Sequence, residues 1–100
     1  MGERSGTLNN VVTTQSIDMS LPAWRAAGYL TLYITGALGS ATGVRVKLTP
    51  DGTRAFYPSQ LSFSALDLDV VENVTLRADS MDIELVGTPD GSTNIDWWVV

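Results

Sequence analysis

The chain has 100 residues, a net charge of −5 and a hydrophobic fraction of 44%, which suits a single folded domain and excludes a disordered chain. It contains neither cysteine nor histidine, so disulfides, thiolate metal sites and the commonest general base are excluded. We therefore expect neither an enzyme nor a bound metal or cofactor. Nucleic-acid binding is disfavoured as well, because no basic cluster is larger than Arg45 with Lys47.

The charges are distributed unevenly along the sequence. Residues 1–60 carry five basic and three acidic side chains, whereas residues 61–100 carry one basic and eight acidic side chains. One interpretation is an acidic surface that keeps the protein soluble. The other is self-complementarity, in which a basic face of one copy meets an acidic face of another. Charge asymmetry alone leaves both interpretations open.

Neither a secretion signal nor a membrane span is expected. The start of the sequence is polar, and no apolar stretch typical of a signal peptide follows it. Residues 26–44 are uncharged over a nearly membrane-spanning length, but they contain four glycines and four Ser or Thr residues. This composition favours a strand followed by a glycine-rich loop over a transmembrane helix.

The N-terminal part of the chain predicts an arm, a strand and a short helical segment. Residues 1–7 are small and polar and predict a flexible arm ahead of a domain that spans residues 8–100. Residues 8–19 are rich in β-branched side chains and predict an edge strand. Residues 20–28 predict one or two helical turns, with Trp24 folded over an open end of the β core. An exposed role for Trp24, stacking on a ligand, is the alternative.

A strand with one aromatic face comes next. Residues 29–35 alternate in polarity, with aliphatic side chains on one face and Tyr29 and Tyr33 on the other. A half-aromatic face suits either a sheet that is covered by a neighbour or a surface that binds a partner. Residues 36–43 then predict a flexible, glycine-rich loop.

Two alternating runs each lead into the same tight-turn tetrapeptide. The strand over residues 44–49 directs Arg45 and Lys47 outward and ends at Thr-Pro-Asp-Gly, residues 49–52. The tetrapeptide recurs at residues 88–91. Proline presets φ at the first central position, and the glycine suits the left-handed conformation that closes a type I turn with a bulge. Each turn predicts a hairpin.

The C-terminal part of the chain is dominated by strands. Three further alternating runs follow, at residues 61–70, 74–78 and 81–85. A change of phase at residues 65–66 predicts a bulge or a turn. The last run, residues 95–100, is apolar on both faces, so that an ordinary outer sheet would leave Trp98 and Val100 in water. We therefore predict that Trp98 is covered by a partner subunit or by the segment around Trp24.

Together these runs predict an all-β fold: a single-domain antiparallel β-sandwich, jelly-roll-like, of about eight short strands. No run is long enough for a helix that would connect parallel strands. The core is expected to gather Leu30, Leu32, Ile34, Val44, Val46, Leu48, Leu61, Phe63, Val74, Leu76, Ile83, Leu85, Ile95 and Trp97.

Outward aromatic and basic residues form the candidate interface, because tyrosine and tryptophan are enriched where proteins meet. The tentative set is Trp24, Tyr29, Tyr33, Arg45, Lys47, Trp98 and Val100. The same aromatic rings would also suit a flat platform that stacks on sugars, which is the alternative interpretation.

One acidic group is a candidate calcium site. Asp67, Asp69 and Glu72 offer the oxygen ligands that calcium prefers, but the spacing lacks the glycine and terminal glutamate of an EF-hand loop. A solvated strand face is the simpler interpretation, and the sequence does not decide between the two.

Several short segments follow one another in a familiar order. They are Ser16–Ser20, Gly28–Gly36, the turn at Thr49–Gly52, Val74–Asp79, Met81–Val86 and Ile95–Trp98. This order resembles that of small β-sandwich virion proteins of tailed bacteriophages, which occur as capsid decoration (cement) proteins and as tail or fibre modules. The resemblance covers most of the chain from Ser16 onward.

The resemblance implies a mechanical function in the virion, which is assembled in the host cytoplasm. A capsid decoration protein stabilises the particle by protein–protein contacts, so the expected partners are the major capsid protein or other virion proteins. Further copies of the chain are also expected partners, in a dimer or a trimer, whereas nucleic acid and membranes are not. The alternative is a tail or tail-fibre module, or a carbohydrate-binding β-sandwich, that mediates host attachment through a glycan.

Overall fold

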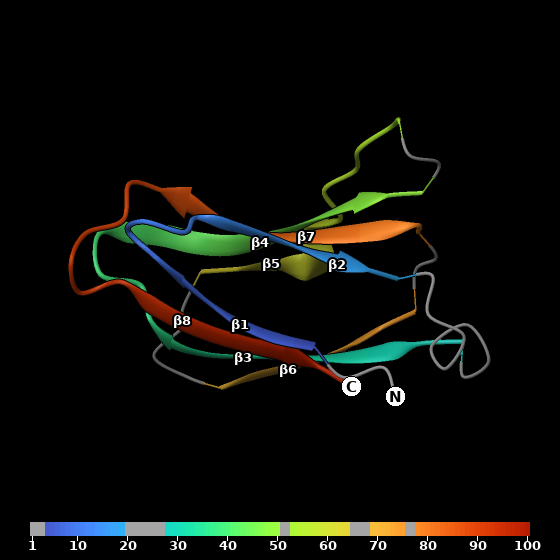
Figure 1. Cartoon of the computed structure of the whole chain (residues 1–100), viewed down its shortest axis with the longest axis horizontal. Helices are drawn as coiled ribbons and strands as arrows, with labels where there is room; N and C mark the ends of the chain where they lie inside the picture. The colour runs from blue at the N-terminus through green and yellow to red at the C-terminus, as the bar shows by residue number, and fades with distance from the viewer. Residues whose placement is uncertain (1–3, 20–27, 51–52, 65–68, 76–77) are drawn as a thin grey trace.

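A computed structural model describes residues 4–19, 28–50, 53–64, 69–75 and 78–100 (Figure 1). These residues form strands and one 3-10 turn (η1, Ser59–Leu61), and they contain no α-helix. The strands are β1 (Arg4–Asn9), β2 (Thr14–Asp18), β3 (Leu30–Ala37), β4 (Ala41–Thr49), β5 (Ser62–Phe63), β6 (Val70–Val74), β7 (Ser80–Gly87) and β8 (Asn94–Val99). The all-β prediction is confirmed. Nor does any helix in this part of the chain have the length and apolarity to cross a membrane.

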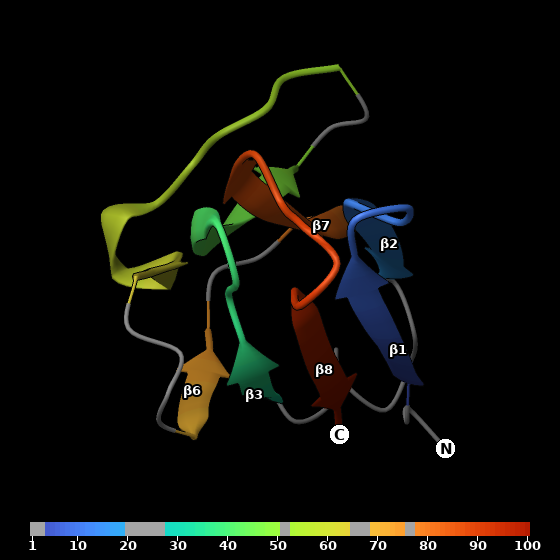
Figure 2. The same cartoon turned by 90° about the vertical axis from the view of Figure 1, so that its left-hand side faces the viewer.

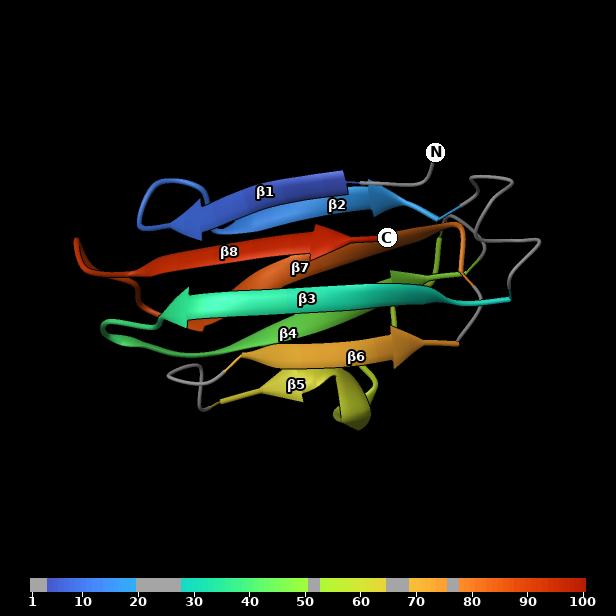
Figure 3. The same cartoon turned by 90° about the horizontal axis from the view of Figure 1, so that it is seen from below.

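The strands form two antiparallel sheets of four strands, packed face to face (Figures 1 and 2). Sheet A has the order β1-β8-β3-β6, which Figure 3 shows across the front of the molecule, and sheet B has the order β2-β7-β4-β5. The first strand pairs with the last, the second with the seventh, the third with the sixth and the fourth with the fifth. This nested pairing, rolled into two sheets, is the jelly roll.

The core lies between the sheets, because every second residue of each strand points inward. Strand β3 shows the rule: Leu30, Leu32 and Ile34 are buried, whereas the residues between them are half-buried. Most of the predicted core is confirmed, although Phe63 and Leu85 are only partly buried. The buried hydrophobic residues that the prediction omitted are Leu8, Ile17, Met19, Ala41, Ala78, Met81 and Val99. Leu76 lies outside the described residues.

The N-terminal prediction needs two corrections. Residues 4–7 belong to β1, which pairs with β8 along its whole length, and are not part of a flexible arm. Their small, polar side chains suit an edge strand. The single strand predicted over residues 8–19 is also wrong, because it breaks at Asn9. The Asn9 Oδ1 accepts hydrogen bonds from the backbone N–H groups of Val11 and Val12, and this turn carries the chain from sheet A to sheet B.

Two predicted connections also differ from the structure. The loop expected over residues 36–43 shrinks to three residues between β3 and β4, closed by a hydrogen bond from the Ala41 N–H to the Leu38 carbonyl. At residues 88–91 the prediction places Gly91 in the left-handed conformation. In the structure Gly87, at the end of β7, adopts this conformation instead, with a φ of 85°. The chain reverses between Asp90 and Thr93, whose N–H donates to the Asp90 carbonyl.

Candidate interaction surface

A row of three apolar side chains and one serine crosses the outer face of sheet A. The strand register places Trp98 of β8 beside Tyr33 of β3, and Val71 of β6 on the other side of Tyr33. Ser5 of β1 completes the row next to Trp98. We call these four positions the aromatic row. Inward neighbours such as Trp97 are buried, so the row lies on the side of the sheet away from the core.

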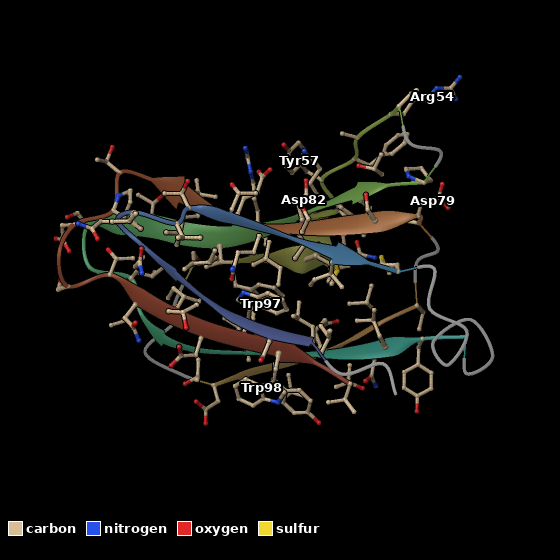
Figure 4. All side chains as sticks on the ribbon, viewed as in Figure 1. Arg54, Tyr57, Asp79, Asp82, Trp97 and Trp98 are labelled. Atoms are coloured by element: carbon tan, nitrogen blue, oxygen red, sulfur yellow. The ribbon has the colours of Figure 1, made fainter. Side chains whose placement is uncertain are left out.

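The two rings of the row stack on each other. The centroids of Tyr33 and Trp98 are 5.1 Å apart and the ring planes differ by 3°. Such a pair contributes about 0.5–1.5 kcal/mol beyond the area that it buries. In Figure 4 the Trp98 side chain lies below sheet A, on the opposite side of the ribbon from Trp97. The last strand therefore directs one indole into the core and the next one outward.

The stack belongs to a larger apolar surface. Val71 is 60% exposed, Val100 is 56% exposed and Tyr29, which precedes β3, is 48% exposed. Val100 extends the pairing of β8, because it exchanges backbone hydrogen bonds with Thr31. We call Tyr29, Tyr33, Val71, Trp98 and Val100 the outer patch. Exposed apolar side chains that gather on one face of a folded protein are typical of interaction sites.

Polar side chains border the outer patch on two sides, and the two borders differ in charge. Next to the aromatic row on one side, Thr7 donates to Asp96 at 2.9 Å and Thr35 donates to Asp69 at 2.7 Å. We call Thr7, Asp96, Thr35 and Asp69 the acidic row. On the other side Thr31 donates to the Asn73 Oδ1 at 2.9 Å, and the described side chains of this border are uncharged.

The outer face of sheet B has the opposite character. Arg45 of β4 faces Glu84 of β7, with its Nε 2.9 Å from the Glu84 Oε1. Lys47 Nζ lies 2.9 Å from the Asp82 Oδ2 and 3.8 Å from the Glu84 Oε2. The hydrogen bond to Asp82 raises the pKa of the Lys47 ammonium above its ordinary value of 10.5. These four charged groups neutralise one another in ion pairs, so this face is polar and does not need a partner for its charges.

A projecting segment lies over the same side of the molecule. Residues 53–58 stand away from the sandwich, with Arg54 near their tip and Tyr57 above sheet B (Figure 4). The Tyr57 ring lies 4.2 Å from the Arg45 guanidinium carbon, a cation–π contact. Phe56 exchanges two backbone hydrogen bonds with Leu48, yet its side chain is 52% exposed. The segment is anchored to β4 but leaves an aromatic side chain in water.

The structure separates the predicted interface into two faces. Four of its members, Tyr29, Tyr33, Trp98 and Val100, belong to the outer patch on sheet A. Arg45 and Lys47 lie on the outer face of sheet B and are already in ion pairs. Trp24 lies outside the described residues, and so does the predicted cover of Trp98 by its segment.

The sequence prediction also omitted exposed apolar residues. Val71 is one, and the doublet Val70-Val71 carried a signal, because only one of two adjacent strand residues can point into the core. Phe56 and Tyr57 are the others. Residues 54–57 are expected from the sequence to return from the turn at residues 49–52 as a strand that ends at Pro58. In the structure only Phe56 of these residues forms a bridge, to Leu48, and both aromatic side chains are about half exposed.

On the core side of β8, Trp97 makes a part-buried hydrogen bond. The indole Nε1 of Trp97 donates to the Gln15 Oε1 at 2.6 Å, which links sheet A to sheet B across the core. Gly6 makes room for this contact: a Cβ at that position would overlap the Gln15 carboxamide and the Trp97 ring. The small residue in β1 is therefore required by the packing of Trp97.

Among the described carboxylates, Asp90 has the pKa that is lowered most clearly, and its hydrogen bonds serve the fold. Asp90 accepts hydrogen bonds from the Ser40 hydroxyl and from both the hydroxyl and the N–H of Ser92, and these bonds lower its pKa to about 2. Beside it the Thr93 hydroxyl donates to the Leu38 carbonyl at 2.7 Å. Together these bonds hold the β3–β4 and β7–β8 connections together at one end of the sandwich.

Metal binding has no support from the described residues. Among them no group of three or more His, Cys, Asp or Glu side chains could hold a metal ion. Asp67, one of the three residues weighed as a calcium site, lies outside the described residues, so that hypothesis stays a prediction. Asp69, the second, accepts the hydrogen bond of Thr35 described above.

Comparisons with protein-family models, with curated proteins and with solved structures found no match for this chain. The surface described above is therefore interpreted from its own chemistry.

Proposed function

We propose that this chain is a structural protein that acts by protein–protein contact, as a capsid decoration protein of a tailed bacteriophage. The outer patch on sheet A is the observation that carries the contact function. The placement in a phage particle follows from the order of sequence segments that resembles virion β-sandwich proteins. No catalytic step enters this proposal.

The contrast between the two sheet faces supports a contact function. A sheet face that remains in water is ordinarily polar, as the outer face of sheet B is with its paired Arg45 and Glu84. Sheet A departs from this with exposed Val71 and Val100 around the Tyr33–Trp98 stack. Rigid aromatic side chains surrounded by polar groups are the composition of binding hot spots, because they bury much area at little cost in conformational entropy.

The proposal is tested on purified particles. Virions carrying the chain are separated on a density gradient, and the copies of the chain per particle are counted by quantitative mass spectrometry against the major capsid protein. A decoration protein is expected at a copy number that matches a symmetry-related set of sites on the shell. Absence of the chain from intact particles would overturn the proposal, and a copy number matching the tail would move the protein from shell to tail.

Glycan binding is the second candidate, and the exposed Tyr29 beside the Tyr33–Trp98 stack favours it. Sugars stack on flat aromatic faces, but here each ring of the pair already covers one face of the other. The two functions separate in a fluorescence titration with a panel of glycans, in which buried Trp97 provides an insensitive background. Contact with proteins predicts unchanged emission, whereas quenching that disappears in Trp98→Ala supports the glycan function.

A further inference from the structure

We propose that the outer patch of sheet A binds the outer patch of a second copy, in a face-to-face dimer whose two-fold axis runs along the aromatic row. The inference deepens the proposed function, on which it rests, by naming the molecule that covers the patch. It concerns the isolated protein, so that it is tested without any particle.

The order of the rows across the sheet is the first argument. The aromatic row lies between the acidic row on one side and a neutral border on the other, and we define the neutral border by the uncharged side chains of Thr31, Asn73 and Val100 among the described residues. Rotation by half a turn about an axis along the aromatic row places each ring against the same row of the partner. It also places the acidic row of one copy over the neutral border of the other. Like charges are therefore kept apart, and the two faces are self-complementary.

Hydrogen-bonding groups match across this arrangement as well. Asn73 uses its Oδ1 to accept the bond from Thr31, so its two amide N–H donors are not used in that bond. The acidic row of a second copy offers the acceptors for those donors. Asp69 and Asn73 lie on either side of Val71, so the two-fold rotation places Asp69 of one copy over Asn73 of the other. A carboxylate accepting from an amide N–H is a charge-assisted bond, shorter and stronger than a neutral one.

The other faces of this chain fit the patch less well. The basic side chains of β4, Arg45 and Lys47, are held by Glu84 and Asp82, and using them to meet the acidic row would break existing ion pairs. The outer face of sheet B also has no described aromatic row to set against the Tyr33–Trp98 stack. Of the two outer sheet faces that the structure describes, that of sheet A is therefore the better partner for the patch.

The size of the face sets the expected strength. Four strands about 4.8 Å apart and about six residues long give a face of roughly 20 Å by 20 Å, or roughly 400 Å² in projection. Because side-chain relief adds to this area, the contact falls near the lower end of standard interfaces, which bury about 800 Å² on each partner. We therefore expect a dimer with a dissociation constant of roughly micromolar order, which forms as concentration rises.

Sedimentation equilibrium of the full chain, over a range from micromolar to millimolar concentration, measures the dimer directly. Val71→Lys places a charge in the aromatic row at an exposed position and should weaken dimerisation by at least about tenfold, since an ammonium group would be buried against apolar surface. Val11→Lys is the matched control, because Val11 is 82% exposed in the β1–β2 turn, away from the patch. Its dimer should be unchanged.

Chemical crosslinking tests the orientation, and the absence of native cysteine makes single-site labelling clean. Thr31→Cys and Thr35→Cys lie on β3, on opposite sides of Tyr33. In the proposed dimer, position 31 of one copy faces position 35 of the other across about 10 Å, the spacing of packed sheets, whereas two copies of position 35 are several ångströms further apart. A short bismaleimide should therefore join the mixed pair preferentially. Ser16→Cys, on the outer face of sheet B, is the negative control.

The outcomes separate this inference from the proposed function. Dimerisation that Val71→Lys abolishes and Val11→Lys retains, with preferential mixed crosslinking, supports the inference. A monomer at every concentration, or equal crosslinking of Ser16→Cys, overturns it. A monomeric chain that is nevertheless present on purified virions keeps the proposed function and transfers the patch to another virion protein. A dimer that is absent from virions keeps the inference and removes the proposed function.

Discussion

The two outer faces of the sandwich obey the same alternation and yet have different chemistry. On sheet B, Arg45 and Glu84 occupy facing positions of neighbouring strands and neutralise each other. On sheet A, the equivalent facing positions hold Tyr33 and Trp98, which stack on each other and leave apolar surface around them. The paired charges of sheet B are sufficient for a sheet face that remains in water. We propose that a partner covers the second pattern, that of sheet A, and substitutions on the two faces test that difference, from the largest expected effect to the smallest.

The largest contrast lies between two neighbouring residues of β8. Trp97→Ala should lower the free energy of unfolding by about 3–5 kcal/mol, because it opens a cavity in the core and leaves Gln15 without its partner. Trp98→Ala removes a half-buried ring from the outer patch and should cost only about 1–2 kcal/mol. Urea unfolding of both variants checks this. Equal losses would mean that Trp98 serves the core and that the outer face is not free.

Gly6→Ala should have the next largest effect, about 1–3 kcal/mol of unfolding free energy, because the added methyl group must displace the Gln15 carboxamide or the Trp97 ring. Thermal unfolding followed by circular dichroism gives the change. Gly91→Ala is the matched control, since a Cβ at Gly91 meets no other atom within 4 Å. If both substitutions cost the same, the packing account of β1 is wrong.

The ring pair of sheet A should show a measurable coupling in the monomer. A double-mutant cycle of Tyr33→Ala and Trp98→Ala is expected to give about 0.5–1.5 kcal/mol of interaction free energy. The measurement is made at a concentration where the protein is monomeric, so that loss of a partner does not contribute. Additive effects of the two substitutions would show that the rings do not stack in solution.

The corresponding cycle on sheet B should give less. Arg45→Ala and Glu84→Ala are expected to couple by at most about 1 kcal/mol, because the Arg45 side chain is largely exposed and solvent screens the pair. Repeating the cycle in high salt should reduce the coupling further, whereas the Tyr33–Trp98 coupling should be insensitive to salt. Salt dependence of both cycles, or of neither, would remove the distinction between the two faces.

The pH dependence of stability should report the hydrogen bonds of Asp90 that join the β3–β4 and β7–β8 connections. Folding lowers the pKa of Asp90 from 3.8 to about 2, so its contribution is complete above pH 3.8 and is lost as the pH falls through about 2. Asp90→Asn should therefore flatten the fall of the melting temperature over that interval. Differential scanning calorimetry between pH 5 and about 2 checks this. A wild type and a variant with parallel profiles would contradict the hydrogen-bonded role of Asp90.

Alternation in the sequence was enough to predict which residues of a strand share a face. It gave the all-β class, most of the core and the outward position of Tyr33 and Trp98, because the period of a strand is two residues whatever its neighbours are. The rule left Val71 unassigned, because the alternating run ends at Val70 and only one residue of the Val70-Val71 doublet can point inward. There the pairing of Tyr33 with Val71 decides which one is exposed, and that pairing is set by distant parts of the chain.

The grouping of the candidate interface could not be predicted for a related reason. Arg45 and Trp98 both point away from a sheet, but β4 and β8 lie in different sheets, so the two residues occupy opposite sides of the molecule. Which strands pair is determined by the whole fold and is not encoded in the local pattern. The edge strand β1 escaped prediction because its polar residues resemble those of a flexible arm, and only its register with β8 shows its role.

The most direct test of the central claim, that the outer face of sheet A and not that of sheet B binds partners, is a sedimentation comparison of two matched variants. Trp98→Ala and Tyr57→Ala each remove one aromatic side chain from an outer face, the first from sheet A and the second from above sheet B. The account predicts that Trp98→Ala raises the dissociation constant of the dimer at least about tenfold while Tyr57→Ala leaves it unchanged. A dimer weakened by Tyr57→Ala and indifferent to Trp98→Ala would contradict it.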